Sequence, residues 1–390
     1  MFFRLSRFLL ALLSAVALVA GAAFAQEGDE QEVDSLPTSI KAGLAVGVRY
    51  ILPTVTNARD RRHDSSGTFD AFIAGAYLNI NQDLENRTNV WLGLGTLRTT
   101  GPEVEDLDDP TSRQLVLTLQ TAGLRSAPAD WFNLEAGVVR SPWEAISREG
   151  WELNYLSSVA ARRYRFISEA DLGASVYGSV PVPATGLFYH LNVTNGETDL
   201  RAEKEKYKAF QSRLTFRPLP LGDYLRPLQL SLGYGYKVDA DPPGPERRDE
   251  QFFGTMLLYD AGIFAVGLEN DLLLRTFRAD ESRTPSGLSS LFFLWTLHPA
   301  YSIFARGDVR DYDLRNDPGK KAIVSSQYKN HTLRADEDLR ATVMSGVVLE
   351  LHWPLDLAPY VEATFYQEPA PGGGATPPTI TANLVAAMRF

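Results

Sequence analysis

The sequence predicts an all-β fold, a 16-stranded antiparallel transmembrane β-barrel. Apolar residues alternate with polar ones along most of the chain after residue 40, which is the period of a strand between two different environments. The connections between these segments are alternately short and long. After the N-terminal segment, no stretch approaches the ~20 apolar residues that a helical membrane span needs.

The composition excludes several classes of protein. With 44% hydrophobic and 22% charged residues, the chain has the balance of a folded protein rather than a disordered one. A net charge of −10 argues against nucleic acid as a partner. The absence of cysteine excludes disulfides, thiolate metal sites and a cysteine nucleophile, and the five histidines have no paired ligand spacing. We therefore expect no cofactor and no metal.

Residues 1–25 have the layout of a cleaved signal peptide. Arg4 and Arg7 precede an uncharged apolar run over residues 8–20, and the small-x-small sequence Ala23-Phe24-Ala25 follows. An uncleaved anchor is the alternative, but the apolar run is short for a span. We interpret residues 26–39 as an acidic periplasmic tail and residues 40–390 as the barrel.

The last segment shows the period-two pattern most clearly. Ile380, Ala382 and Leu384 lie on one wholly apolar face, and Thr381 and Asn383 lie on the other. Sixteen such segments occur, each about as long as a tilted strand needs to be to cross a bilayer. They are residues 40–52, 70–82, 88–98, 114–125, 131–141, 170–181, 186–196, 207–218, 228–239, 250–260, 262–277, 290–299, 301–313, 340–353, 357–367 and 379–390.

The connections indicate how the barrel is oriented. Short turns on one side and long loops on the other, such as residues 142–169 and 278–289, are typical of outer-membrane barrels with periplasmic turns. The chain also ends in a strand whose last residue is Phe390, as barrels inserted by the bacterial barrel assembly machinery do. The expected surroundings are outer-membrane lipid and lipopolysaccharide. A secreted soluble β protein is the alternative, but it would have to cover many apolar faces and strand edges.

One stretch carries a family likeness. A strand with Gly137 runs into Pro142-Trp143, a long loop follows, and the next strands carry Asp171-Leu172-Gly173 and Asn195-Gly196. This pattern resembles the phosphate- and polyphosphate-selective porins, the O and P porin family. The resemblance implies a Gram-negative outer-membrane porin, usually a homotrimer, that passes small anionic or neutral solutes.

If the apolar face meets lipid, the other face lines a water-filled channel. Basic residues outnumber acidic ones on that face, and rings of basic residues favour anions, so an anion channel is one hypothesis. A wall of Arg–carboxylate pairs with weak selectivity is the other. The basic candidates are Lys41, Arg49, Arg213, Arg217, Lys237, Arg275, Arg306, Arg310, Arg340 and Arg389, and the acidic ones are Glu135, Asp171, Glu269, Asp271, Asp308, Glu350 and Glu362.

The loop of residues 142–169 follows the fifth strand, where the loop of sixteen-stranded porins commonly folds into the barrel. Guanidinium groups in such a narrow site would bind phosphate or carboxylate bidentately. A solvated surface loop is the alternative. The candidate constriction residues are Arg148, Glu149, Glu152, Arg162, Arg163 and Arg165.

Two further functions remain open, a loop-occluded structural barrel and an outer-membrane enzyme. An esterase would need Ser, His and a third polar residue together. His190, Asn192 and Thr194 share a strand face, but no nucleophile signature accompanies them, so we expect no catalytic residues. The pattern does not assign Trp91 or Trp131 to either face.

Overall fold

The structure is a computed structural model of the 390-residue chain. It describes residues 38–52, 69–84, 87–98, 115–129, 131–180, 186–196, 208–218, 225–239, 248–277, 283–311, 314, 339–352, 355–366 and 378–389. The predicted signal peptide, residues 26–37 of the predicted tail and Phe390 lie outside the described residues.

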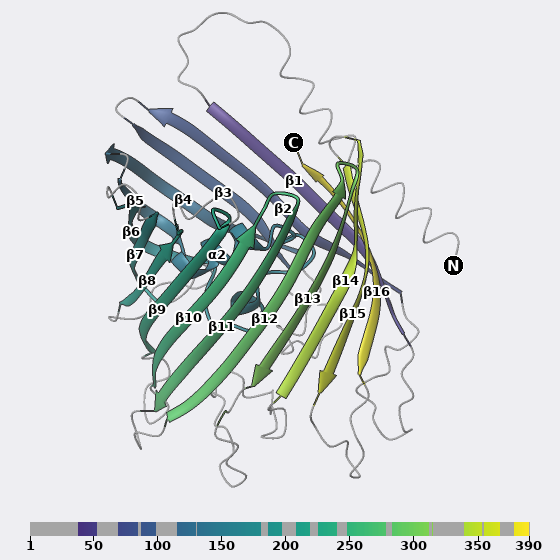
Figure 1. Ribbon diagram of the computed structural model, residues 1–390. Helices are drawn as coiled ribbons and strands as arrows, with labels where there is room; N and C mark the ends of the chain where they lie inside the picture. The colour runs from purple at the N-terminus through teal and green to yellow at the C-terminus, as the bar shows by residue number, and fades with distance from the viewer. Residues whose placement is uncertain are drawn as a thin grey trace, which may run out of the picture.

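The strands form a closed antiparallel barrel in which each strand pairs with its neighbours in sequence and β1 pairs with β16, as predicted (Figure 1). Closure leaves no strand edge unpaired. The strands are β1 Thr38–Ile51, β2 Phe69–Leu84, β3 Thr88–Arg98, β4 Leu115–Ala129, β5 Phe132–Arg140, β6 Ala170–Ser179, β7 Leu187–Thr194, β8 Ala209–Phe216, β9 Leu228–Asp239, β10 Arg248–Asp260, β11 Phe264–Phe277, β12 Arg283–His298, β13 Tyr301–Asp311, β14 Leu339–His352, β15 Leu355–Tyr366 and β16 Thr379–Arg389.

The β10–β11 and β12–β13 turns and the end of β16 lie at the same end of the barrel, which we call the short-turn end (Figure 1). One predicted connection is wrong. Residues 283–289 belong to β12 and pair with β11, whereas the sequence predicted a loop over residues 278–289. Ser286 faces inward and Ser289 outward, so both faces of this part carry polar residues and the period is hidden.

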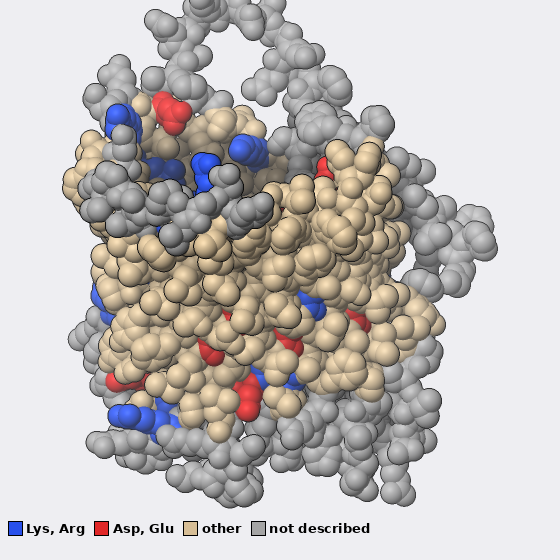
Figure 2. Space-filling model, viewed as in Figure 1, with Lys and Arg blue, Asp and Glu red and all other residues tan. Residues whose placement is uncertain are grey.

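The outer face of the barrel is apolar. Large side chains such as Leu230, Leu257 and Leu291 are more than two-fifths exposed there. Figure 2 shows a broad belt of uncharged side chains across the visible face, with charged ones mostly above and below it. This outer surface matches the apolar face of the predicted transmembrane strands.

Residues 141–169, which we call the inner loop, connect β5 to β6 and fold inside the barrel (Figure 1). They contain helix α2, Pro142–Gly150, and the short helix α3, Ala160–Arg163. No helix among the described residues is long and apolar enough to cross a membrane.

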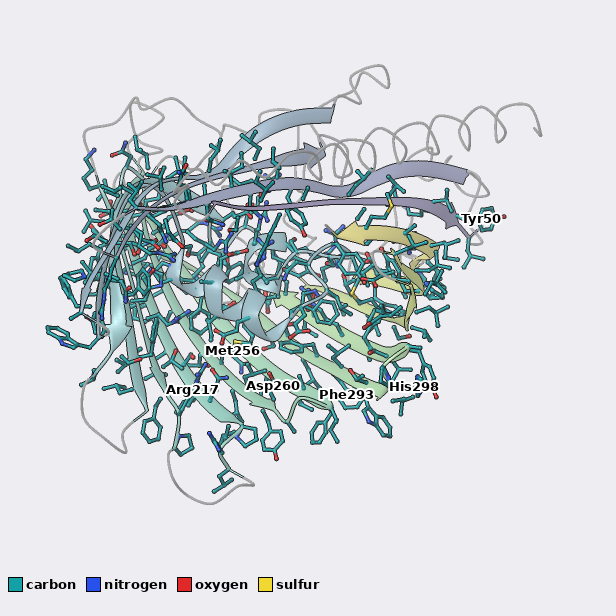
Figure 3. The ribbon with its side chains drawn as sticks, turned by 90° about the horizontal axis from the view of Figure 1, so that it is seen from above. Tyr50, Arg217, Met256, Asp260, Phe293 and His298 are labelled. Atoms are coloured by element: carbon teal, nitrogen blue, oxygen red, sulfur yellow. The ribbon has the colours of Figure 1, made fainter. Side chains whose placement is uncertain are left out.

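The sequence of α2 explains its position. Pro142 stands in the first turn, where its missing N–H costs nothing, and Trp143 and Ile146 lie on the buried side. Gly150 lets α2 approach β10, because a Cβ there would lie 2.9 Å from Met256 Cε. Figure 3 shows Met256 on the inner side of the wall beneath α2 and Phe293 on the outer side.

The inner loop and the strands beyond it form an apolar core inside the barrel. Its wall is the inward face of β10–β15, which we call the covered wall. The core includes Trp143, Ile146, Trp151, Leu153, Leu156, Tyr164 and Phe166 of the inner loop and Phe252, Met256, Leu258, Leu273, Leu288, Phe292, Phe304, Met344, Val348 and Tyr360 of the covered wall.

Candidate pore and constriction

Helix α2 is attached to the barrel by hydrogen bonds to buried wall residues. Trp143 Nε1 donates to Glu269 Oε1 at 2.8 Å, and Ser147 Oγ donates to the same oxygen at 3.0 Å. Arg213 Nη1 donates to the Pro142 carbonyl oxygen at 2.9 Å. Because a buried carboxylate needs such donors, Glu269 ties α2 to the centre of β11.

The segment around α3 is attached to β13 and β15. Arg163 Nη2 lies 2.6 Å from Glu362 Oε1, and Arg306 Nη1 donates to the Ser158 carbonyl at 2.7 Å. Arg306 also forms a bidentate pair with Asp308, with distances of 2.9 and 3.0 Å, and lies 5.2 Å from the Trp151 ring centroid. These residues therefore hold the inner loop, and their charges are largely matched by partners.

A second network joins the two ends of the inner loop. Arg148 and Arg162 both pair with Glu169, and Glu144 lies between Arg140 and Arg148. Burial raises the pKa of Glu144, although Arg140 and Arg148 oppose that rise. The network closes the base of the loop against β5.

Nine of the predicted wall residues occupy inward positions of a strand or, for Arg217, the position directly after one. Arg213, Arg306, Asp308 and Arg310 are buried beneath or beside the inner loop. Arg217 follows β8 and pairs with Glu149 of α2 at 3.1 Å, with both side chains about half exposed. The remaining members of the set are Arg49, Arg275, Glu350 and Glu362.

The predicted constriction arginines do not form a single cluster. Arg162 pairs within the inner loop, Arg163 pairs with β15, and Arg165 is exposed. Glu149 and Glu152 are exposed as well. The sequence could place these residues in one loop, but it did not show that their partners lie in different places, some within the loop and others on the barrel wall.

Arg165 instead joins a group from the wall, which we call the arginine cluster: Arg165, Arg275, Arg310 and Arg340. Arg310 is directly opposite Arg340 in the β13–β14 register, and Arg275 of β11 donates to Ser286 Oγ on β12, the strand between β11 and β13. Arg275 also pairs with Glu250 at 3.2 Å. Basic residues of β11, β13 and β14 therefore face the inside of the barrel near one another.

The inward face of β2–β5, which we call the open wall, has a different composition. Asn79, Asn81, Trp91 and Arg125 face inward there and stay partly exposed, whereas α2 packs against β7, β8, β10 and β11 and α3 against β12. The sequence did not predict that Trp91 and Arg125 face the inside of the barrel. Trp91 is as apolar as the outward residues Val90 and Leu92 beside it, so only its pairing with inward Asn81 reveals its side.

One Ser–His contact lies on the neighbouring strands. Ser175 Oγ and His190 Nε2 are 2.8 Å apart, and both side chains are buried. Contact with a substrate would require the surrounding side chains to move. Among the described residues, no group of three or more His, Asp or Glu side chains is arranged to hold a metal ion.

A closed sixteen-stranded antiparallel barrel with a loop folded inside it is the fold of outer-membrane porins. No family model and no curated protein matches the chain by sequence. Solved structures do match in fold. An anion-selective porin from Comamonas acidovorans has 10% identity and a TM-score of 0.61, covering 91% of this chain and 99% of that one. OprB of Pseudomonas putida has 10% identity and a TM-score of 0.59, covering 90% and 94%. The trimer form of OmpT from Vibrio cholerae has 11% identity and a TM-score of 0.55, covering 92% and 100%.

Proposed function

We propose that the chain forms a water-filled channel in the outer membrane of a Gram-negative bacterium, through which small hydrophilic solutes diffuse passively with a preference for anions. The observation that carries the proposal is the arginine cluster beside a loop folded into a porin-type barrel. Since that loop narrows the lumen, solutes must pass close to the wall charges, and a low-dielectric surrounding strengthens their effect.

The fold neighbours support two finer parts of the proposal. One is described as an anion-selective porin and one was solved as a trimer. We extend the proposal to a homotrimer and, through the resemblance of residues 137–196, to the phosphate-selective branch. Guanidinium groups bind phosphate bidentately, so phosphate should compete with chloride at the arginine cluster.

The proposal includes no catalysis. The enzyme alternative would require an accessible nucleophile, but Ser175 is only 1% exposed. The loop-occluded barrel predicts folded protein without conductance, so one electrical experiment separates it from the channel.

The test is single-channel recording in a planar bilayer under a KCl gradient. We expect conductance steps, a reversal potential that indicates chloride preference, and a lower chloride current after phosphate is added. The double variant Arg310→Ala/Arg340→Ala should shift the reversal potential towards cations, whereas Arg310→Lys/Arg340→Lys, which keeps both charges, should shift it much less.

Arg226→Ala is the matched control, because this arginine is exposed in the β8–β9 connection away from the cluster. Different gel migration of unheated and boiled samples verifies folding of each variant. Steps with an unchanged reversal potential in the double Ala variant would remove the arginine cluster from the proposal. Folded protein without steps would favour the occluded barrel.

A further inference from the structure

Two aromatic rings of the open wall lie directly on glycine backbone. A Cβ at Gly43 of β1 would lie 2.3 Å from Tyr77 Cε1, and a Cβ at Gly123 of β4 would lie 2.9 Å from Trp91 Cη2. A larger residue at position 43 would displace the Tyr77 ring, whereas one at position 123 would collide first with the Ala136 carbonyl oxygen, 2.2 Å away, and also with Trp91. Both aromatic residues are only half-buried, so part of each ring remains accessible from the lumen.

A paired charge stands beside the Trp91 ring. Arg125 binds Glu135 through two nitrogens, at 2.7 Å from Nε and 2.6 Å from Nη2, and Tyr177 donates to the same Glu135 oxygen at 2.8 Å. The Arg125 guanidinium carbon is 5.8 Å from the Trp91 ring centroid, and the Arg125 side chain is 43% exposed. Its remaining N–H groups therefore lie where a solute can reach them.

Amide side chains continue the series along the pore. Asn79 and Asn81 face inward on β2; Asn79 lies between the level of Tyr77 and that of Trp91, and Asn81 pairs with Trp91. Tyr77 and Asn81 are four residues apart, about 13 Å along a strand. Aromatic faces, amides and an Arg–Glu pair thus follow one another towards the short-turn end.

We propose that Tyr77, Asn79, Asn81, Trp91, Arg125 and Glu135 form a binding track for a neutral saccharide. A sugar ring offers an apolar C–H face, which fits a partly exposed aromatic ring, and hydroxyls that both donate and accept hydrogen bonds. Amides and an Arg–Glu pair supply both partners. Because Glu135 balances the charge of Arg125, the track attracts anions less than the arginine cluster does, and cations gain little from it.

The track goes beyond the proposed anion channel, since it assigns a second solute class to a different wall. The first measurement is calorimetric binding of maltotriose, a neutral glucose trimer, to the folded full-length protein in detergent. The second is block of the single-channel current by maltotriose, with polyethylene glycol of similar mass as the control for simple obstruction. Binding without conductance would retain the track and reject the channel; conductance without binding would do the reverse.

Trp91→Ala should weaken maltotriose binding about tenfold, about 1.4 kcal/mol, while Trp91→Phe, which keeps an aromatic face, should weaken it less. Trp295→Ala is the matched control, because this tryptophan faces outward and is 41% exposed. Glu135→Gln should also weaken binding. Three results would overturn the track. They are no calorimetric binding of maltotriose, equal maltotriose binding in Trp91→Ala and wild type, or stronger phosphate block in Glu135→Gln without any change in maltotriose binding.

Discussion

The covered wall and the open wall belong to one sheet, but the inner loop packs against the inward face of the covered wall. The covered wall points Phe252, Met256 and Phe292 into the barrel, where the inner loop buries them. The open wall points Asn79, Asn81 and Arg125 inward, and these side chains stay in partial contact with the lumen. The outward faces of both walls are apolar.

The difference shows that the type of residue on an inward face depends on what packs against that face inside the barrel, and not on the barrel fold alone. A barrel strand needs an apolar outer face in lipid, whereas its inner face can carry a continuous apolar surface where a protein segment packs against it inside the barrel. If the proposed channel function holds, some substitutions should alter the attachment of the inner loop and others the passage of solutes. Substitutions of Trp151, Glu362, Glu144 and Arg217 should affect the docking of the inner loop to a decreasing degree.

The largest effect is expected for Trp151→Ala. Trp151 contacts Phe292 and Phe304, with ring centroids 5.7 and 6.0 Å away, and its indole N–H donates to the Ser157 carbonyl. Removing a buried tryptophan costs about 3–5 kcal/mol. We expect the inner loop to detach, which raises conductance and accelerates amide hydrogen exchange in residues 142–165.

Trp295→Ala serves as the control, because it removes the same side chain from the lipid side. Unboiled samples of both variants should still migrate as folded barrels. If Trp151→Ala exchanged as slowly as wild type, the apolar core would not be what holds the inner loop.

A smaller effect on the docking of the inner loop is expected when the ion pair between α3 and β15 is broken. Glu362→Gln leaves the partly buried Arg163 without its charged partner at 2.6 Å. Loss of a hydrogen bond to a charged group costs about 1.5–3 kcal/mol. The measurement is the free energy of opening of residues 160–166 by hydrogen exchange, in a double-mutant cycle with Arg163→Gln.

A coupling energy near zero in that cycle would mean that each residue acts through other contacts. We expect a larger coupling energy than for an exposed ion pair, because both side chains are at most about one-fifth exposed.

The sequence predicted the closed sheet, apart from residues 283–289 of β12, and it predicted that the loop after the fifth strand folds into the barrel. The alternation in residues 228–237 and 379–390 predicted the lipid face correctly, because outward residues meet one uniform environment. It was not sufficient for the partners of the loop. Met344 and Val348 blur the alternation of β14 because they face inward into the core, and only the packed loop explains them.

The candidate site was predictable to a lesser degree. Period two placed Arg310 and Arg340 on the inner face, but their proximity to Arg165 depends on how the inner loop folds back. Trp91 could not be assigned, because hydropathy favours lipid for tryptophan and glycine at residue 123 is what makes room for the ring. Cross-strand neighbours, rather than residues adjacent in sequence, determine such sites.

A weaker effect concerns pH and the base of the inner loop. Burial raises the pKa of Glu144 above the value that it has when the loop is open, and Glu169 adds to the rise while Arg140, Arg148 and Arg162 oppose it. Between these two pKa values the docked loop keeps a proton that the open loop releases. Acidification from pH 7 therefore stabilises docking, and the gain is complete below the open-state pKa.

Hydrogen exchange of α2 between pH 7 and pH 4, corrected for the intrinsic exchange rate, measures this dependence. Glu144→Gln should flatten it, whereas Glu149→Gln, at an exposed position of the same helix, should not. An identical pH dependence in Glu144→Gln and wild type would assign the effect to another group.

The smallest effect on docking is expected for Arg217→Ala, at the short-turn end of the barrel directly after β8. Arg217 pairs with Glu149 at 3.1 Å, almost as closely as Arg163 pairs with Glu362, but the two side chains are 46% and 53% exposed. Exposed pairs contribute about 0–1 kcal/mol and are screened by salt. Opening of α2 should therefore change little, and less still at 1 M KCl. A loss as large as that for Glu362→Gln would mean that the inner loop is held mainly by charges at its edge rather than by its apolar contacts with the covered wall.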